Sequence, residues 1–208
     1  MHSEVLIVAD ASRGPRIECT GALAARRTEP HTVHLVSAAA TPLGGDTITI
    51  RVIVEAGARL VLRSVAATMV LPGVDSVASH ALWDLQVAGE LDLDPEPTVI
   101  AGASSHLAMT RLHIDGAGSA RLRERVQIGR SGERDGFWSG TLHADVSDGP
   151  LLRHRVELGT GSVSDDALGR PLACVSELRY PQAAFDGRGT VLQLADGGAL
   201  ATWQGDRL

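Results

Sequence analysis

The sequence contains no lysine and no asparagine, and it has only two cysteines and six aromatic residues. All 19 basic residues are therefore arginines. Without lysine the chain cannot form a Schiff base, and it lacks both the P-loop lysine and the phosphate-binding lysine of protein kinases. Two cysteines are too few for a four-cysteine zinc site or for an iron–sulfur cluster held by one chain. These absences exclude several classes of enzyme.

Charge and hydropathy also argue against two classes of partner. The net charge of −6 is the opposite of the basic excess typical of nucleic-acid-binding proteins. The apolar run Val5–Ala9 follows no positively charged segment and is too short for a signal peptide, and no run reaches the ~18 residues of a membrane-spanning helix. Cys19 and Cys174 are far apart without CxxC spacing, which favours two reduced, partly buried thiols. We therefore expect a cytoplasmic protein that binds neither nucleic acid nor membranes.

Two pairs of segments have the pattern of β-strands. The first pair is 47–54, rich in β-branched residues, and 58–63, separated by a turn at 55–57. The second pair is 141–146 and 151–158, around the Asp-Gly step at 148–149. Short Gly-containing connections between such runs are typical of β-hairpins. The sequence therefore predicts two hairpins.

Other segments are less regular. In 121–128 arginines alternate with apolar residues, which predicts a strand with one cationic and one apolar face. Residues 75–89 fit either a short helix or an extended segment, and 164–168 fits a capped turn. With 23 glycines and 9 prolines scattered along the chain, many short elements are expected rather than long helices.

The length fits a single domain, with no internal repeat or long linker. We expect residues 1–208 to form one mainly β domain with a largely antiparallel sheet and very few α-helices. Its core must consist mostly of Val, Leu, Ile and Ala, because aromatic residues are scarce. Such a core could be completed by a partner.

Known catalytic motifs are absent. The chain has no GxSxG, HExxH or GxGxxG. His31 and His34 would point to opposite faces of a strand, which is poor for chelation, but to the same face of a helix. A binding or scaffold role is therefore favoured over catalysis.

Three polar residues call for a closer look. Glu124 lies on the apolar face of its predicted strand, and so does His154. A buried carboxylate needs a partner or a path to water. Asp46 follows Gly44 and Gly45, which read most simply as a turn that Asp46 caps. The three residues together permit the hypothesis of a polar channel, whereas each alone reads as a satisfied core or turn residue.

The arginine-rich faces of 121–125 and 153–155 read by default as solvated strand faces. Their functional alternative is a protein interface, since arginine is enriched at interface hot spots.

A set of short motifs, in order over about residues 31–180, resembles the UreD (UreH) family of urease accessory proteins. The motifs are His34-Leu35-Val36, Leu43-Gly44-Gly45-Asp46 with the strand 47–54, Glu55-Ala56-Gly57-Ala58, Leu60 to Thr68, Gly89 to Pro97, Ile128-Gly129-Arg130, Phe137-Trp138-Ser139-Gly140 and Asp148-Gly149-Pro150-Leu151-Leu152.

The resemblance implies a fold and a function. The expected fold has two sheet layers with helix-like strand winding. The expected role is a non-enzymatic scaffold, or chaperone, that binds the urease structural subunits. It would recruit UreF and, through UreF, the GTPase UreG, so that nickel is inserted into urease, with an internal polar tunnel as its path.

The resemblance also assigns residues. It places Asp46 on the tunnel, Glu124 where the family carries an acid and His154 where it usually carries Glu. That histidine is a departure from the family, although imidazole also suits nickel. No tightly bound cofactor is expected, only transient nickel whose ligands are unknown. The chain is expected to be shortened at its C-terminal end relative to the family.

Two alternatives remain. One is a small β-domain metalloenzyme with Asp46, Glu124 and His154 as ligands. The other is an unrelated protein-binding module.

Overall fold

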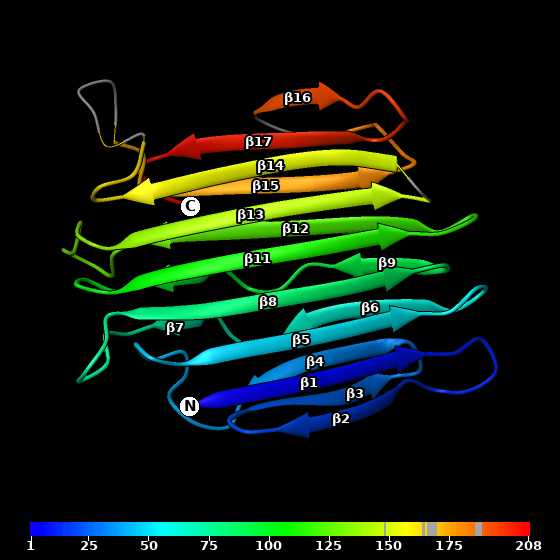
Figure 1. Ribbon diagram of the computed structural model, residues 1–208, viewed down its shortest axis with the longest axis horizontal. Helices are drawn as coiled ribbons and strands as arrows, with labels where there is room; N and C mark the ends of the chain where they lie inside the picture. The colour runs from blue at the N-terminus through cyan, green and yellow to red at the C-terminus, as the bar shows by residue number, and fades with distance from the viewer. Residues whose placement is uncertain (148, 164, 166–169, 186–188) are drawn as a thin grey trace.

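The chain folds into two packed β-sheets (Figure 1). The computed structural model describes residues 1–147, 149–163, 165, 170–185 and 189–208, and they contain strands but no helix. The seven-stranded sheet has the order β14 (Gly149–Gly159), β13 (Phe137–Val146), β11 (Ser105–Ile114), β8 (Ala78–Val87), β5 (Thr47–Val54), β1 (His2–Ala9) and β2 (Arg16–Thr20). The ten-stranded sheet has the order β16 (Thr190–Gln193), β17 (Ala199–Gly205), β15 (Ala173–Tyr180), β12 (Ser119–Ile128), β9 (Glu90–Leu93), β6 (Arg59–Ser64), β4 (Thr32–Ser37) and β3 (Leu23–Glu29), with β10 (Thr98–Ile100) beside β12 and β7 (Thr68–Val70) beside β10.

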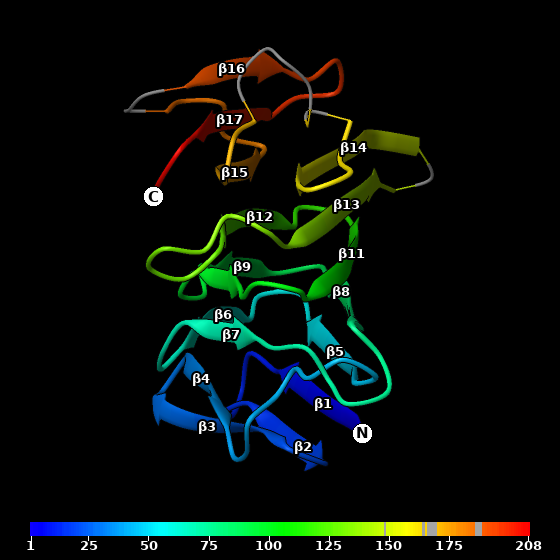
Figure 2. The same cartoon turned by 90° about the vertical axis from the view of Figure 1, so that its left-hand side faces the viewer.

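The middle of the chain winds like a helix whose turns are strands. It passes from β5 in one sheet to β6 in the other, then to β8, β9, β11, β12 and β13, so that successive coils stack on one another (Figure 2). Strands of successive coils run in the same direction, and the pairings β1–β5, β5–β8, β8–β11 and β11–β13 are all parallel. The expected all-β, two-layer, helically wound fold is confirmed. The expectation of a largely antiparallel sheet is wrong for these coils, because each crossover runs through the opposite layer.

The first predicted hairpin is also a crossing from one sheet to the other. Residues 47–54 and 59–64 are both strands, but β5 belongs to the seven-stranded sheet and β6 to the ten-stranded sheet. The turn before β6 carries the chain across the core, where the buried sides of both strands meet. The hairpin prediction is therefore wrong, although both strands exist.

The other segments follow the sequence more closely. β13 and β14 form the second predicted hairpin, with an irregularity between Ala144 and Asp145, and Asp148 of its turn lies outside the described residues. The alternation in β12 is confirmed, because Leu122, Val126 and Ile128 are buried. Segment 75–89 is extended and contains β8. The predicted turn at 164–168 lies outside the described residues except for Asp165.

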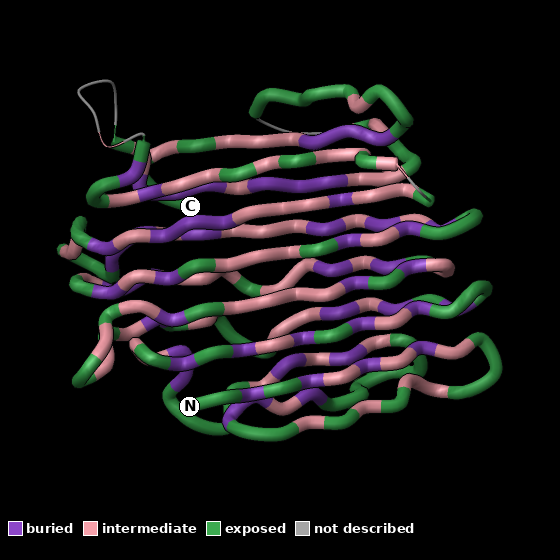
Figure 3. The backbone as a smooth tube through the Cα atoms, viewed as in Figure 1, coloured by how far each residue is buried: buried purple, intermediate pink, exposed green. Residues whose placement is uncertain are grey.

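The core lies between the sheets and is largely aliphatic. Buried and less buried positions alternate along the strands (Figure 3). Ile7, Leu60, Leu85 and Ile114 are almost completely buried, and Trp138 is the largest fully buried side chain. Both cysteines are free thiols, as predicted. Within the described residues, no helix is long and apolar enough to cross a bilayer. That residues 1–208 form a single domain stays a prediction.

Candidate functional site

A slot interrupts the ten-stranded sheet beside β12. Residues 119–122 of β12 pair with β9, and residues 126–128 pair with β10. The chain between β9 and β10 reads Asp94-Pro95-Glu96-Pro97, and its two prolines have no N–H with which to continue the ladder. Residues 123–125 of β12 are therefore without a strand partner on this side.

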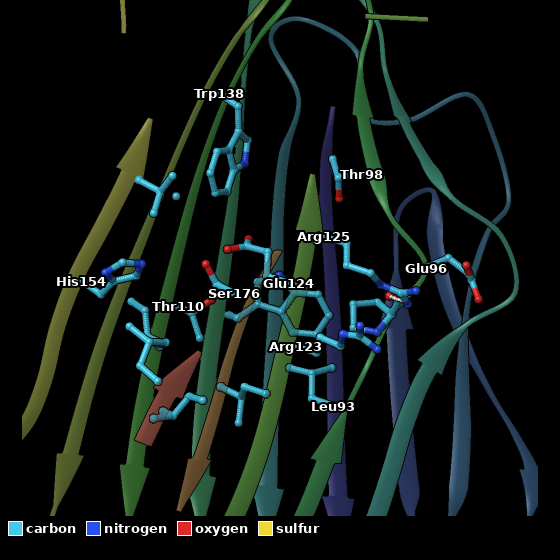
Figure 4. Close-up of a pocket in the computed structure, with 18 residues that line it drawn as sticks. Leu93, Glu96, Thr98, Thr110, Arg123, Glu124, Arg125, Trp138, His154 and Ser176 are labelled. Atoms are coloured by element: carbon cyan, nitrogen blue, oxygen red, sulfur yellow. Dashed lines mark hydrogen bonds between the residues drawn. The ribbon is translucent and has the colours of Figure 1, made fainter. Parts of the chain in front are cut away.

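A cavity of about 90 Å³ lies behind the slot, between the two sheets. We call it the Glu124 cavity. Glu124 reaches it from β12, Ser176 from β15, His154 from β14 and Thr110 from β11, with Trp138 forming part of its wall (Figure 4). Since a single water needs about 10–15 Å³ of such space, the cavity has room for several waters or for an ion with part of its hydration shell.

Two of the titratable groups that line this cavity, Glu124 and His154, are uncharged over part of the neutral range. Burial raises the pKa of Glu124 to about 7, and no hydrogen bond within the described residues opposes this shift. Glu124 is intermediate in exposure and lines the cavity. Burial also lowers the pKa of His154, whose Nε2 is buried without a hydrogen-bond partner in the described part of the chain. The cavity thus presents a neutral imidazole beside a carboxyl group that can release a proton, and both are groups that can bind a metal ion.

Arginines surround the mouth of the slot. Arg125 donates to Asp94 at 2.9 Å and to the carbonyl of Pro95 at 2.7 Å. Arg123 lies 3.8 Å from Asp94, and both Arg123 and Arg125 line the cavity. In Figure 4 these two arginines and Glu96 lie on the side of the cavity opposite His154.

The cationic face of β12 is a network of ion pairs. Arg121 donates to Glu177 at 2.8 Å, to Asp92 at 3.0 Å and to Asp94 at 3.3 Å. Burial alone would raise the pKa of Glu177, but its bonds with Arg121 and Arg179 outweigh that effect and lower it. These arginines therefore hold neighbouring strands together. They do not form a simply solvated face, which was the default interpretation of the sequence.

A second cavity, of about 230 Å³, adjoins the first. We call it the His106 cavity. Its walls are mostly apolar and include Leu35, Ile48 and Ile50. His106 projects from β11, and its Nδ1 lies 2.9 Å from the hydroxyl of Ser79. Burial and, to a lesser degree, the nearby His80 lower the pKa of His106 to about 4, so its imidazole is neutral at pH 7.

Asp46 lies apart from the Glu124 cavity. Its carboxylate accepts hydrogen bonds from the backbone N–H of Leu43 at 2.8 Å, from Thr41 at 2.9 Å and from the amino group of Met1 at 2.7 Å. Burial opposes ionisation, but these donors outweigh it and lower the pKa of Asp46. Asp46 lines neither of the two cavities, whereas Thr41 lines the His106 cavity.

The glycines before Asp46 have a structural reason. A side chain at Gly44 would overlap the carbonyl oxygen of Ser76, and Gly45 has a φ of 90°. The tight turn that these glycines allow brings the backbone of Leu43 to the carboxylate of Asp46.

The structure thus brings Glu124 and His154 to one cavity and leaves Asp46 outside it. Among the described residues no group of three or more His, Cys, Asp or Glu side chains is arranged to hold a metal ion. His34 contacts Thr28 at 2.9 Å and His31 is exposed. His106 was missed by sequence reasoning, although its place on the apolar face of 105–114 is the same signal that singled out Glu124.

Comparison with known proteins settles the family. The family model "UreD urease accessory protein" matches residues 10–178. The chain belongs to the UreD family. The resemblance seen in the sequence motifs is therefore confirmed, and it extends further toward the N-terminus than they indicated.

Individual relatives carry the same family name. A UreD urease accessory protein from Frankia alni is 42% identical over 146 residues, which cover 62% of this chain and 49% of the relative. The UreD of Frankia casuarinae is 43% identical over 150 residues, covering 66% and 47%. UreD 1 of Saccharopolyspora erythraea is 37% identical over 182 residues, covering 83% and 71%. The chain thus spans about half the length of the two Frankia relatives.

Proposed function

We propose that this chain acts in urease maturation as a non-enzymatic scaffold. It binds the structural subunits of apo-urease in the cytoplasm and recruits UreF and, through UreF, the GTPase UreG. Membership of the UreD family supports this role. The protein catalyses no reaction of its own, and it retains no cofactor tightly.

In this proposal nickel is the cargo, and the Glu124 cavity is part of its path. The observation that carries the proposal is that Glu124 and His154 converge from different sheets on one cavity inside a UreD fold. Two ligands suit transfer better than storage, because a third or fourth protein ligand would hold the ion more tightly. Nickel entering beside Glu124 displaces its proton, since a carboxylate binds metal only when ionised.

Asp46 acts in this path through a neighbour. Its carboxylate accepts a hydrogen bond from the hydroxyl group of Thr41, and Thr41 lines the adjoining His106 cavity. In that arrangement Asp46 positions the cavity wall without touching the ion.

The test is co-expression of the tagged chain with the urease subunits, UreF and UreG, followed by co-purification and an assay of urease activity at limiting nickel. We expect Glu124→Gln and His154→Ala to recruit the complex normally and to leave urease largely inactive. His143→Ala on β13 and Glu90→Gln on β9 are matched controls outside the lining of either cavity, and they should activate urease like the wild type. If nothing co-purifies with the wild-type chain, the scaffold role is wrong. Full activation by both cavity variants would rule out the path.

A further inference from the structure

Trp83 lies at the boundary between the two cavities. It projects from β8, where it stands between Ile50 of β5 and Thr110 of β11 in the strand register. It lines both the Glu124 cavity and the His106 cavity. Among the described residues facing it, only the segment around Pro95 and Thr98 lines both cavities as well. Trp83 and this segment therefore form the partition between the cavities.

The indole is held by packing alone. Trp83 retains intermediate exposure although it lies between the sheets, because it borders cavity space on two sides. It makes no hydrogen bond with the part of the chain that the structure describes. The partition is thus a side chain without a polar anchor.

Space for movement lies next to it. Ala81, Ala108 and Gly140 are neighbours in register across β8, β11 and β13, one inward-facing position from Trp83 along its strand. Trp138 already covers Gly140, since a Cβ on that glycine would overlap its ring. The room beside Trp83 is therefore over Ala81, which lines the His106 cavity.

We propose that Trp83 is a gate between the two cavities. In the observed position its indole separates them, and rotation toward Ala81 joins them into one passage. The passage then has a neutral imidazole on each side, His154 on one and His106 on the other, and a cation passing the open gate meets the face of the indole, a favourable contact. This inference rests on the proposed nickel path and adds its regulation.

The partition itself can be tested without nickel. Xenon binds apolar cavities of this size, so xenon-pressurised crystals of the chain should show xenon in the His106 cavity. In Trp83→Ala, xenon density should extend through the position of the indole into the Glu124 cavity. Leu82→Ala is the matched control, because it removes an apolar side chain from the same strand but on the outer face, and it should leave the xenon sites unchanged. Xenon still confined to the His106 cavity in Trp83→Ala would overturn the gate.

Gating is tested in the complete maturation complex by the initial rate of urease activation. We expect Trp83→Ala to raise this rate roughly fivefold, since the cost of turning the side chain is removed. Ala81→Leu fills the space into which the indole turns and should lower the rate by a similar factor. Simple loss of stability would lower the rate in both variants, so opposite signs identify a gate.

The outcomes separate this inference from the proposed function. If the rate in Trp83→Ala equals that of the wild type while Glu124→Gln lowers it, the gate is wrong and the path stands. If Glu124→Gln and His154→Ala also leave the rate unchanged, the path itself is wrong.

Discussion

The buried carboxyl group of Glu124 predicts a stability that depends on pH and that Glu124→Gln removes. Burial raises the pKa of this group from 4.5 to about 7 in the folded protein. Between those pH values the folded state holds a proton that the unfolded state has released, so stability falls as pH rises and becomes level above pH 7. Linkage over that interval gives a loss of about 2.5 kcal/mol between pH 5 and pH 8.

The assay is urea unfolding of the wild type and of Glu124→Gln at pH 5 and at pH 8. Glutamine keeps the size of the side chain but cannot ionise. The free energy of unfolding of the variant, relative to the wild type, should therefore increase by about 2.5 kcal/mol from pH 5 to pH 8. Other titrating groups are the same in both proteins, so their contributions cancel in this difference. Glu90→Gln, at a half-exposed site, is the control and should show no such change.

A difference that stays constant from pH 5 to pH 8 would refute the reasoning. It would mean that Glu124 ionises as readily in the folded chain as in the unfolded one. The carboxyl group would then not be buried as the structure places it.

Two further predictions concern the same sheet. Arg121→Ala should destabilise the protein by roughly 2 kcal/mol in urea unfolding, because Arg121 donates to three carboxylates and hydrogen bonds to charged groups are the stronger ones. Arg59→Ala removes a more exposed ion pair and should cost less than about 0.5 kcal/mol in the same assay. The difference between these two losses of stability should shrink on acidification. The lowered pKa of Glu177 confers stability only while that carboxylate stays ionised. Burial and, secondarily, the charge of Glu124 raise the pKa of the Cys174 thiol. Iodoacetamide at pH 8 should therefore alkylate Cys174 only after the chain unfolds, which peptide mass spectrometry can measure. Rapid labelling of Cys174 in the native chain would contradict its burial.

How much of the fold the sequence predicts depends on what alternation can and cannot encode. Alternating apolar residues identified β5, β6, β12, β13 and β14 as strands. The same alternation is compatible with a hairpin and with a crossing between layers, because in both cases one face of each strand is buried. Local pattern therefore could not reveal that β5 and β6 lie in different sheets, and it took the resemblance to the UreD family to indicate the winding.

The candidate site, like the fold, could be predicted only in part from alternation. Alternation placed Glu124 and His154 on inward faces, and the structure agrees. That both reach one cavity depends on the stacking of β14 over β12 and β15, which links residues far apart in the chain. Asp46 was singled out by its Gly-Gly-Asp turn and by the family resemblance. Its carboxylate bonds with Leu43 and Thr41, and it lines neither cavity.

In the proposed path, nickel passes between Glu124 and His154. The most direct measurement is anomalous diffraction at the nickel edge from nickel-soaked crystals of the chain in complex with its urease partners. We expect an anomalous peak in the Glu124 cavity of the wild type and none there in Glu124→Gln. Nickel found only at surface histidines such as His80 or His113, with the cavity unlabelled in the wild type, would contradict the claim.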